Sequence, residues 1–247
     1  MPGDPVSRRG FLKLCASAGA LVTSSPRLLA QGAPERVQAP PASLVHPDGR
    51  PLRLTDLAVG ENYVFHYPFV STPCFLIDLG KPALPLDGLE LDDGRRYHWR
   101  GGVGPNRSVV AFSAICAHRM SYPTPSVSFI HYRHGPMAFK DKDLKPSRRE
   151  QVIYCCSEGS VYDPAEGCRV LGGPAPQPLA AIDLALDGDT NTLRAQGTYG
   201  GDMFERFFEK FEFQLALQQR EDNIRELVGP TTEVVALKDY SANTNVC

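Results

Sequence analysis

The stretch that decides the fold is CCSEGSVYD, residues 155–163. A cysteine pair ends the apolar run EQVIY, and a Gly-Ser turn, an aromatic residue and an aspartate follow. A second segment has a similar build, because CAH (residues 116–118) directly follows the apolar run SVVAFSAI. Thiolate and imidazole groups bind zinc, copper and iron. Two short loops at strand ends can hold such a metal between them, and the sequence therefore predicts a metal site.

Composition excludes several functional classes. The chain has 247 residues, 42% of them hydrophobic and 22% charged, which suits one globular domain with extensions. The formal net charge is -2 with both signs interspersed, so no nucleic-acid surface is predicted. The sequence shows no hydrolytic triad, phosphate-binding loop or four-ligand zinc set, so no catalytic residues are predicted.

Short apolar runs broken by turns extend from about Leu52 to Leu193. The strand-like runs are NYVFHYPF (62–69), PCFLIDL (73–79), SVVAFSAIC (108–116), EQVIYCC (150–156) and AAIDLALD (180–187). The segments LDDGRRYHW (91–99) and LDGDTNTLRAQG (186–197) are typical of hairpins. This pattern predicts an all-β, antiparallel domain.

The N-terminus has the form of an export signal. SRRGFLK (7–13) contains a twin-arginine pair, and the mildly apolar run that follows is too short for a convincing membrane span. Residues 1–32 are therefore predicted to be a twin-arginine signal, which sends a folded protein to the periplasm. An uncleaved signal would keep the protein associated with the membrane. Residues 33–50, rich in Pro and Ala at their start, are predicted to be a linker.

A helical extension and tail are predicted for residues 198–247. Phenylalanines recur at i, i+3, i+4 and i+7 on one helix face: Phe204, Phe207, Phe208 and Phe211. Two interpretations stay open, namely packing against the domain and docking of a partner subunit. REDNIRELVG (220–229) is expected to form a second helical piece that stops at Gly229-Pro230.

Three segments carry a family resemblance: FHYPFVSTPCFLIDLG (65–80), GGVGPNRSVVAFSAICAH (101–118) and GGPAPQPL (172–179). In this order they resemble Rieske proteins, most closely the small subunit of arsenite oxidase, which the GVGP-x-R stretch favours. The resemblance covers roughly residues 63–197. It implies a Rieske-type antiparallel β-barrel or sandwich over residues 51–197, with a small subdomain that binds a [2Fe–2S] cluster through loops 116–121 and 155–163.

The resemblance also assigns ligands. Cys116 and His118 match the first ligand pair, and Cys155 matches the third ligand. Glu158 stands at the fourth position, where the family has histidine. Three alternatives stay open: the Glu158 carboxylate binds iron, His131 or His134 of the long segment between the loops completes the site, or the cluster is lost. In an empty site, Cys116 and Cys155 could form a disulfide.

Residues around the ligands are assigned in the same way. Ser160 and Tyr162 match the hydroxyl pair that hydrogen-bonds a bridging sulfide and a cysteine thiolate. Gly173 and Pro174 belong to GGPAP (172–176), which matches the loop that covers the cluster. The two cysteines that link the loops in many Rieske proteins are replaced by Ser121 and Ser157. Cys156 and Cys168 are candidates for a local disulfide, which export permits.

The resemblance implies an electron-transfer subunit of a periplasmic oxidoreductase rather than a catalyst alone. The expected partners are a larger catalytic subunit of the molybdenum type and a cytochrome c or a quinol-linked complex. The alternative is an assembly subunit of a redox complex that has kept the fold and lost the cluster.

Overall fold

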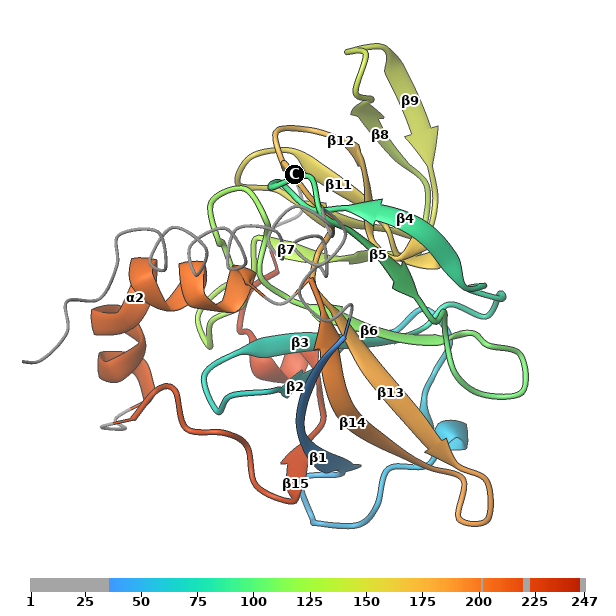
Figure 1. Cartoon of the computed structure of the whole chain (residues 1–247), viewed down its shortest axis with the longest axis vertical. Coiled ribbons are helices and arrows are strands. Elements are labelled where there is room, and N and C mark those ends of the chain that lie inside the picture. Colours follow the sequence, from blue (N-terminus) through green and yellow to red (C-terminus); the bar gives the residue numbers. More distant parts are fainter. Residues whose placement is uncertain (1–35, 201, 220–222, 245–247) are drawn as a thin grey trace, which may run out of the picture. The chain divides into compact units, whose positions relative to one another are not determined.

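In the computed structural model, residues 36–200, 202–219 and 223–244 are described (Figure 1). The twin-arginine signal predicted for residues 1–32 lies outside them. Within the described ranges, no helix combines the length and apolar character that crossing a membrane requires.

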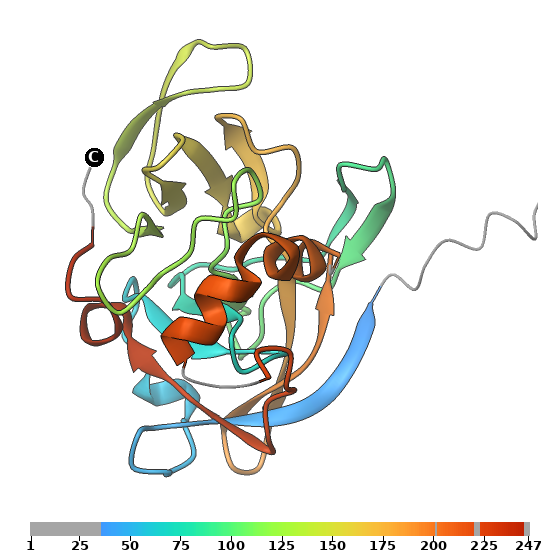
Figure 2. The same cartoon turned by 90° about the vertical axis from the view of Figure 1, so that its left-hand side faces the viewer.

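The larger of two main sheets is an eight-stranded one with the order β15-β1-β14-β13-β6-β3-β2-β16. Its strands are β1 (Val37–Val45), β2 (Tyr63–His66), β3 (Pro73–Asp78), β6 (Val109–Ser113), β13 (Ala181–Asp187), β14 (Thr192–Tyr199), β15 (Thr231–Glu233) and β16 (Val235–Ala236). The edge strands β15 and β16 are separated along the chain by Val234 alone, whose N–H donates to the Val45 carbonyl at 2.8 Å. One segment therefore joins both edges and closes the sheet into a barrel, which can be followed in Figures 1 and 2.

The second main sheet has four strands in the order β12-β11-β10-β7. These are β7 (Ile130–Arg133), β10 (Val152–Cys155), β11 (Ser160–Asp163) and β12 (Arg169–Gly172). Two separate hairpins are β4–β5 (Leu86–Glu90, Arg96–Trp99) and β8–β9 (Met137–Lys140, Pro146–Arg149). The hairpin β8–β9 is an insertion between β7 and β10, and it projects away from the barrel in both views (Figures 1 and 2).

The structure confirms the predicted mostly-β architecture. A smaller β-unit carries the second cysteine loop, and a helix lies near the C-terminus. Each of the five strand-like runs contains a strand, and both predicted hairpins are present. The one parallel pair among the described strands is β1 with β15. All other strand pairs in the described ranges are antiparallel, as predicted.

The linker predicted for residues 33–50 is wrong for residues 37–45, which form the barrel strand β1. Pro40 and Pro41 suggested a linker, but they lie where the pairing of β1 with β14 is interrupted, between Gln38 and Ala42. Prolines at such an irregularity remove no ladder hydrogen bond, so the strand tolerates them. Beyond them, Ala42 and Leu44 are buried in the core.

The boundary placed at residue 197 is also wrong, because the C-terminal segment contributes strands to the barrel. Residues 231–236 supply β15 and β16, and a short helix, α3 (Leu237–Tyr240), follows them. The second helical piece is not formed in its described part. Residues 223–229 are turns and extended chain, and Leu227 forms a β-bridge with Phe69.

The long helix α2 (Met203–Gln219) packs against the domain through its phenylalanine stripe, which favours the first interpretation of that stripe. Phe207 and Phe208 are fully buried. The Phe208 ring meets Phe69 of the barrel edge-on at a centroid distance of 5.1 Å. On the opposite face, Phe213 and Leu217 are 78% and 66% exposed. Figure 2 shows the helix lying beside the barrel.

Candidate metal centre

Two buried thiols lie side by side at the ends of two strands that belong to different sheets. Cys116 follows β6 of the barrel, and Cys155 ends β10 of the smaller sheet. Both are free and completely buried, and each thiol shifts the pKa of the other, as groups that lie close together do. The structure therefore brings together two of the predicted ligands from distant parts of the chain, and the disulfide considered between them is not formed.

Tight backbone turns hold both cysteines in place. In the first loop, the Met120 N–H donates to the Cys116 carbonyl at 2.9 Å, and the Cys116 N–H donates to the Ser121 carbonyl at 2.8 Å. In the second loop, the Gly159 N–H donates to the Cys155 carbonyl at 2.8 Å. Gly159 has a φ of 76°, a conformation that glycine adopts without steric cost.

The covering loop predicted at residues 172–176 is pressed onto the second cysteine loop. A Cβ atom on Gly173 would clash with the Gly159 carbonyl oxygen and the Ser160 Cα, and Gly173 also has a φ of 81°. Only glycine satisfies both the approach and the backbone angle. Pro174 follows in the same exposed turn.

Tyr162 connects the thiols to the first loop. Its hydroxyl lies 3.3 Å from the Cys116 sulfur and accepts a hydrogen bond from the Ala117 N–H at 3.1 Å. Ser160 lies in the same strand, β11, and is fully buried; its hydroxyl makes no hydrogen bond of normal geometry among the described residues, yet it is near enough to the Cys116 thiol to lower the pKa of that thiol. A buried polar group without a partner costs free energy, and such groups occur where a bound group satisfies them.

The electrostatics of the pair favour one thiolate. The hydrogen bond from the Cys155 thiol lowers the pKa of Cys116, and the Tyr162 hydroxyl acts in the same direction. The same contact raises the pKa of Cys155, because its ionisation would remove that donor and place two negative sulfurs in contact. One sulfur is therefore prepared to bind a cation, and the second loses its proton when the cation arrives.

His118 and Glu158 lie beyond the thiols and near each other. The His118 Nδ1 atom is buried without a hydrogen-bond partner and lies 3.8 Å from a Glu158 carboxylate oxygen. The other oxygen of Glu158 lies 3.4 Å from the guanidinium of Arg119. Because the Arg119 side chain is 66% exposed, this ion pair contributes about 0–1 kcal/mol. Glu158 is therefore held weakly by the protein itself.

His131 and His134 are not brought to the thiols. In the pairing of β10 with β7, Cys155 is opposite Ile130 and Tyr154 is opposite His131. Paired residues share a face and neighbours along a strand alternate, so His131 lies on the face of the sheet away from Cys155. The His134 Nδ1 atom lies 3.3 Å from the Tyr132 hydroxyl.

The local disulfide between Cys156 and Cys168 is not formed. Cys168 is a free thiol with no exposed surface, and burial raises its pKa. Its N–H donates to the Asp163 carbonyl at 2.8 Å, which closes this turn. Cys156 itself is disulfide-bonded.

The residues around the thiols fit the cluster that the sequence implies in donor type but form no closed ligand set in the part of the chain that the structure describes. Within the ranges described, no group of three or more His, Cys, Asp or Glu side chains is arranged so that it could hold a metal ion. The donor types nevertheless fit an iron–sulfur group: two free thiols that shift each other's pKa, and the unpartnered Nδ1 of His118 and hydroxyl of Ser160 near them in the sequence. At the fourth position, the chain offers a carboxylate.

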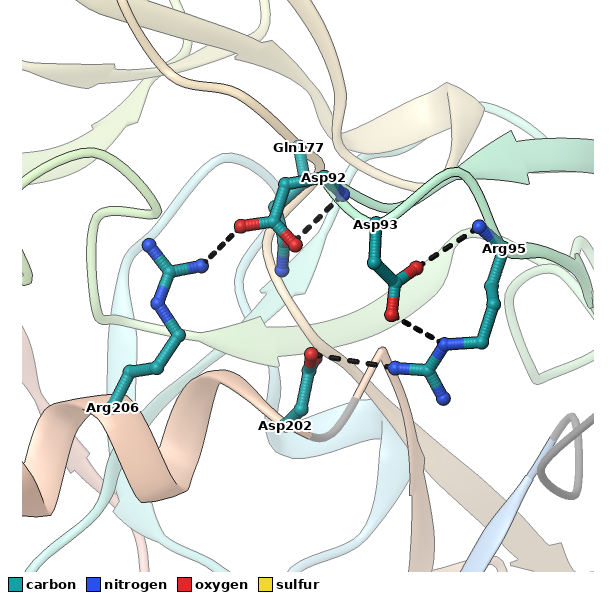
Figure 3. Close-up of polar contacts among 6 residues, drawn as sticks. All are labelled: Asp92, Asp93, Arg95, Gln177, Asp202 and Arg206. Carbon is teal, nitrogen blue, oxygen red and sulfur yellow. Dashed lines mark hydrogen bonds and ion pairs between the residues drawn. The ribbon is translucent and has the colours of Figure 1, made fainter.

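A polar network fastens the covering loop, and sequence reasoning missed it. Gln177, the residue after GGPAP, accepts a hydrogen bond from the Asp92 N–H at 3.1 Å, and the Asp92 carboxylate lies 2.5 Å from Arg206 of α2 (Figure 3). Arg95 joins Asp93 at 2.5 Å to Asp202 at 3.4 Å. The start of α2, the β4–β5 turn and the covering loop are thus held together.

Helix α2 also supports the first cysteine loop. The Tyr122 ring meets Phe207 edge-on at 5.0 Å, and its hydroxyl donates to Gln218 at 2.9 Å. The Lys210 ammonium donates to the Arg119 carbonyl at 2.5 Å. The phenylalanine period pointed to Phe207, but no local signal pointed to Lys210 or Gln218, because the sequence assigned their segment to an extension.

Solved protein structures include chains that are similar to this one. No family model matches the chain. A solved structure that resembles it is the soluble domain of the Rieske protein II (soxF) from Sulfolobus acidocaldarius, at 25% sequence identity. The match covers 65% of this chain and 78% of that chain, with a TM-score of 0.44. At this TM-score the likeness is partial.

Proposed function

We propose that this chain is an electron-transfer protein of the Rieske type. Its ligands would be the Cys116 and Cys155 thiolates, the His118 imidazole and the Glu158 carboxylate. The observation that carries the proposal is the pair of buried thiols, each of which shifts the pKa of the other, with the Tyr162 hydroxyl 3.3 Å from the Cys116 sulfur. A [2Fe–2S] cluster bound there takes up and releases one electron at a time.

The surrounding residues have definite tasks in this proposal. Tyr162 places a hydroxyl on the Cys116 sulfur, and the Ser160 hydroxyl remains available as a further donor. Hydrogen bonds to cluster sulfurs raise the reduction potential, since they stabilise the more negative reduced state. The covering loop around Gly173 lies against the second cysteine loop at Gly159 and Ser160.

We further propose the setting that the sequence implies. The twin-arginine form of residues 7–13 supports export of the folded protein to the periplasm. There it would pass electrons between a larger catalytic subunit of the molybdenum type and a cytochrome c or quinol-linked complex. An uncleaved N-terminus would associate it with the membrane.

A second function is favoured by a specific observation. Glu158 is paired with Arg119 and His118, and no three-ligand group forms among the described residues. A protein that has lost its cluster would show such internal pairing. It would then serve as an assembly subunit of a redox complex, with its rigid barrel and α2 as the assembling parts.

Purified protein distinguishes the two functions. The first predicts about two iron atoms and two acid-labile sulfides per chain, visible absorption, and a rhombic electron paramagnetic resonance (EPR) signal after reduction. The Cys116→Ser variant should lose iron, whereas Cys74→Ser, which alters a free buried thiol on β3, should keep it. Wild-type protein without iron, isolated with its export signal intact and under anaerobic conditions, would leave only the assembly function.

A further inference from the structure

Strand β13 separates from its neighbour β6 soon after the two strands meet. Their pairing consists of Ala181 opposite Phe112, whereas β13 continues to Asp187 and stays paired with β14 on its other side. Among the described residues, no main-chain group of residues 183–186 is hydrogen-bonded on the β6 side. Successive residues of a strand direct their N–H and C=O groups to alternate sides, so part of these groups faces this side. The barrel therefore has an open strand edge at residues 183–186, which we call the β13 edge.

A cleft of about 420 Å³ follows the β13 edge. Residues 183–186 and Gln196 form one of its walls, and residues 100–104 and Arg107 form the other. Extended chain advances about 3.3 Å per residue, so residues 183–186 offer an edge about 13 Å long. The cleft gives an extended segment of polypeptide access to that edge.

The opposite wall is held by hydrogen bonds of its own. The Gly102 N–H donates to the Ala83 carbonyl at 2.8 Å, and the Val103 N–H donates to the Val109 carbonyl at 2.8 Å. Gly101 has a φ of 83°, and a Cβ atom on it would lie 2.6 Å from the Ala83 carbonyl oxygen. This position therefore requires glycine. The loop is bonded to other parts of the fold and leaves the β13 edge open.

The charged side chains at the cleft are mostly basic. Asp183 is 5% exposed, and its carboxylate is paired with Arg36 at 2.6 Å. Arg100 lies 3.8 Å from the same carboxylate, and its side chain is 64% exposed. Arg107 forms no ion pair with a described carboxylate, and its guanidinium donates to the Arg100 carbonyl at 2.5 Å. An acidic ligand in the cleft would therefore meet two guanidinium groups, while a third already neutralises Asp183.

We propose that the β13 edge is a docking site for an extended, acidic segment of another protein, which adds to the barrel as a strand. Main-chain hydrogen bonds to the edge hold the segment, and its carboxylates pair with Arg100 and Arg107. Open edges also pair with one another, but two copies of this site would bring like charges together, which disfavours a second copy as the occupant. The site lies on the barrel and does not depend on whether a cluster is bound.

Hydrogen exchange of the exported, full-length protein tests the site with a defined probe. The probe is a peptide of alternating glutamate and valine, because glutamate supplies the charge and valine favours extended chain. At saturating peptide, the amides of residues 183–186 that face the cleft should exchange at least tenfold more slowly, and those of β3 should be unchanged. Unchanged exchange at residues 183–186, or protection confined to another part of the chain, would overturn the proposal.

Two control peptides separate strand addition from attraction between charges. The same peptide with every amide N-methylated keeps its charge but donates no main-chain hydrogen bond, so it should not protect the β13 edge. A peptide with lysine in place of glutamate keeps the main chain but reverses the charge, and it should not protect the edge either. Protection by either control that equals that of the acidic peptide would contradict the proposal.

Variants of the basic residues test the charge of the ligand. The double variant Arg100→Gln, Arg107→Gln should bind the acidic peptide about fivefold more weakly, as expected for the loss of two exposed ion pairs. The matched control is Lys142→Gln, which removes an exposed cation from the turn between β8 and β9 and should bind like wild type. Equal affinity of the double variant would refute an acidic ligand. Protection of the β13 edge that rises with protein concentration without peptide would identify a second copy as the occupant and overturn the proposal.

Discussion

Replacement of Glu158 by histidine is the sharpest test of the fourth ligand. In the structure, the Glu158 carboxylate is held by Arg119 at 3.4 Å, and the Arg119 side chain is 66% exposed. Loss of such a pair changes the free energy of unfolding by about 1 kcal/mol at most. We therefore expect Glu158→His to fold like wild type, so that changes in iron content or potential can be assigned to the site.

The size of the shift follows from charge. A carboxylate ligand adds one negative charge beside the group that gains an electron, whereas a neutral imidazole adds none. Two unit charges about 5 Å apart interact with about 3 kcal/mol at an effective dielectric constant of about 20. For a one-electron couple this corresponds to a shift on the order of 100 mV. The variant should therefore retain its iron and show a reduction potential higher by that amount.

The assay is a redox titration followed by EPR, together with iron analysis of each preparation. The matched control is Glu90→Gln, because Glu90 also forms an ion pair with an arginine, Arg96 at 2.6 Å, but in the β4–β5 hairpin. Its potential should equal that of wild type. An iron-loaded wild type whose potential is unmoved by Glu158→His would refute the carboxylate ligand. A wild type without iron that gains iron in Glu158→His would identify a site emptied by this one residue.

Three further predictions concern stability and export. Phe207→Ala should lower the free energy of unfolding by about 3–5 kcal/mol in urea titrations, because its ring is fully buried, while Phe213→Ala on the exposed face should change it by less than about 0.5 kcal/mol. Burial lowers the pKa of the His66 imidazole to about 4 from 6.5. As the pH drops from 6.5 towards 4, the imidazole is protonated in the unfolded chain but not in the folded one, so the free energy of unfolding should fall over that range. His66→Gln should show a smaller loss over that range, and an equal loss would contradict the assignment. Changing Arg8 and Arg9 to Lys should keep the protein in the cytoplasm, as cell fractionation would report; a normal periplasmic yield would show that residues 7–13 are no signal.

Local sequence determined the strands and the two cysteine loops. Continuous apolar stretches with β-branched residues mark the runs around Val109–Ser113 and Val152–Cys155, and both became strands, the first of which ends shortly before Cys116 and the second at Cys155. Gly159 and Gly173 mark positions that need a positive φ. The phenylalanine period determined the helix α2, whose buried face is the predicted one.

Only the tertiary structure decided what the ends of the chain do. Residues 37–45 and 231–236 look like a linker and a tail because each buries little surface alone, yet together they complete the barrel as the parallel pair β1 and β15 and as β16. Contacts of such long separation leave no local pattern. Three details of the site have the same origin: His131 is kept off the thiol face, Asp92 anchors Gln177, and Cys168 is free. Strand register and packing decide each of them, and the spacing of residues along the sequence does not.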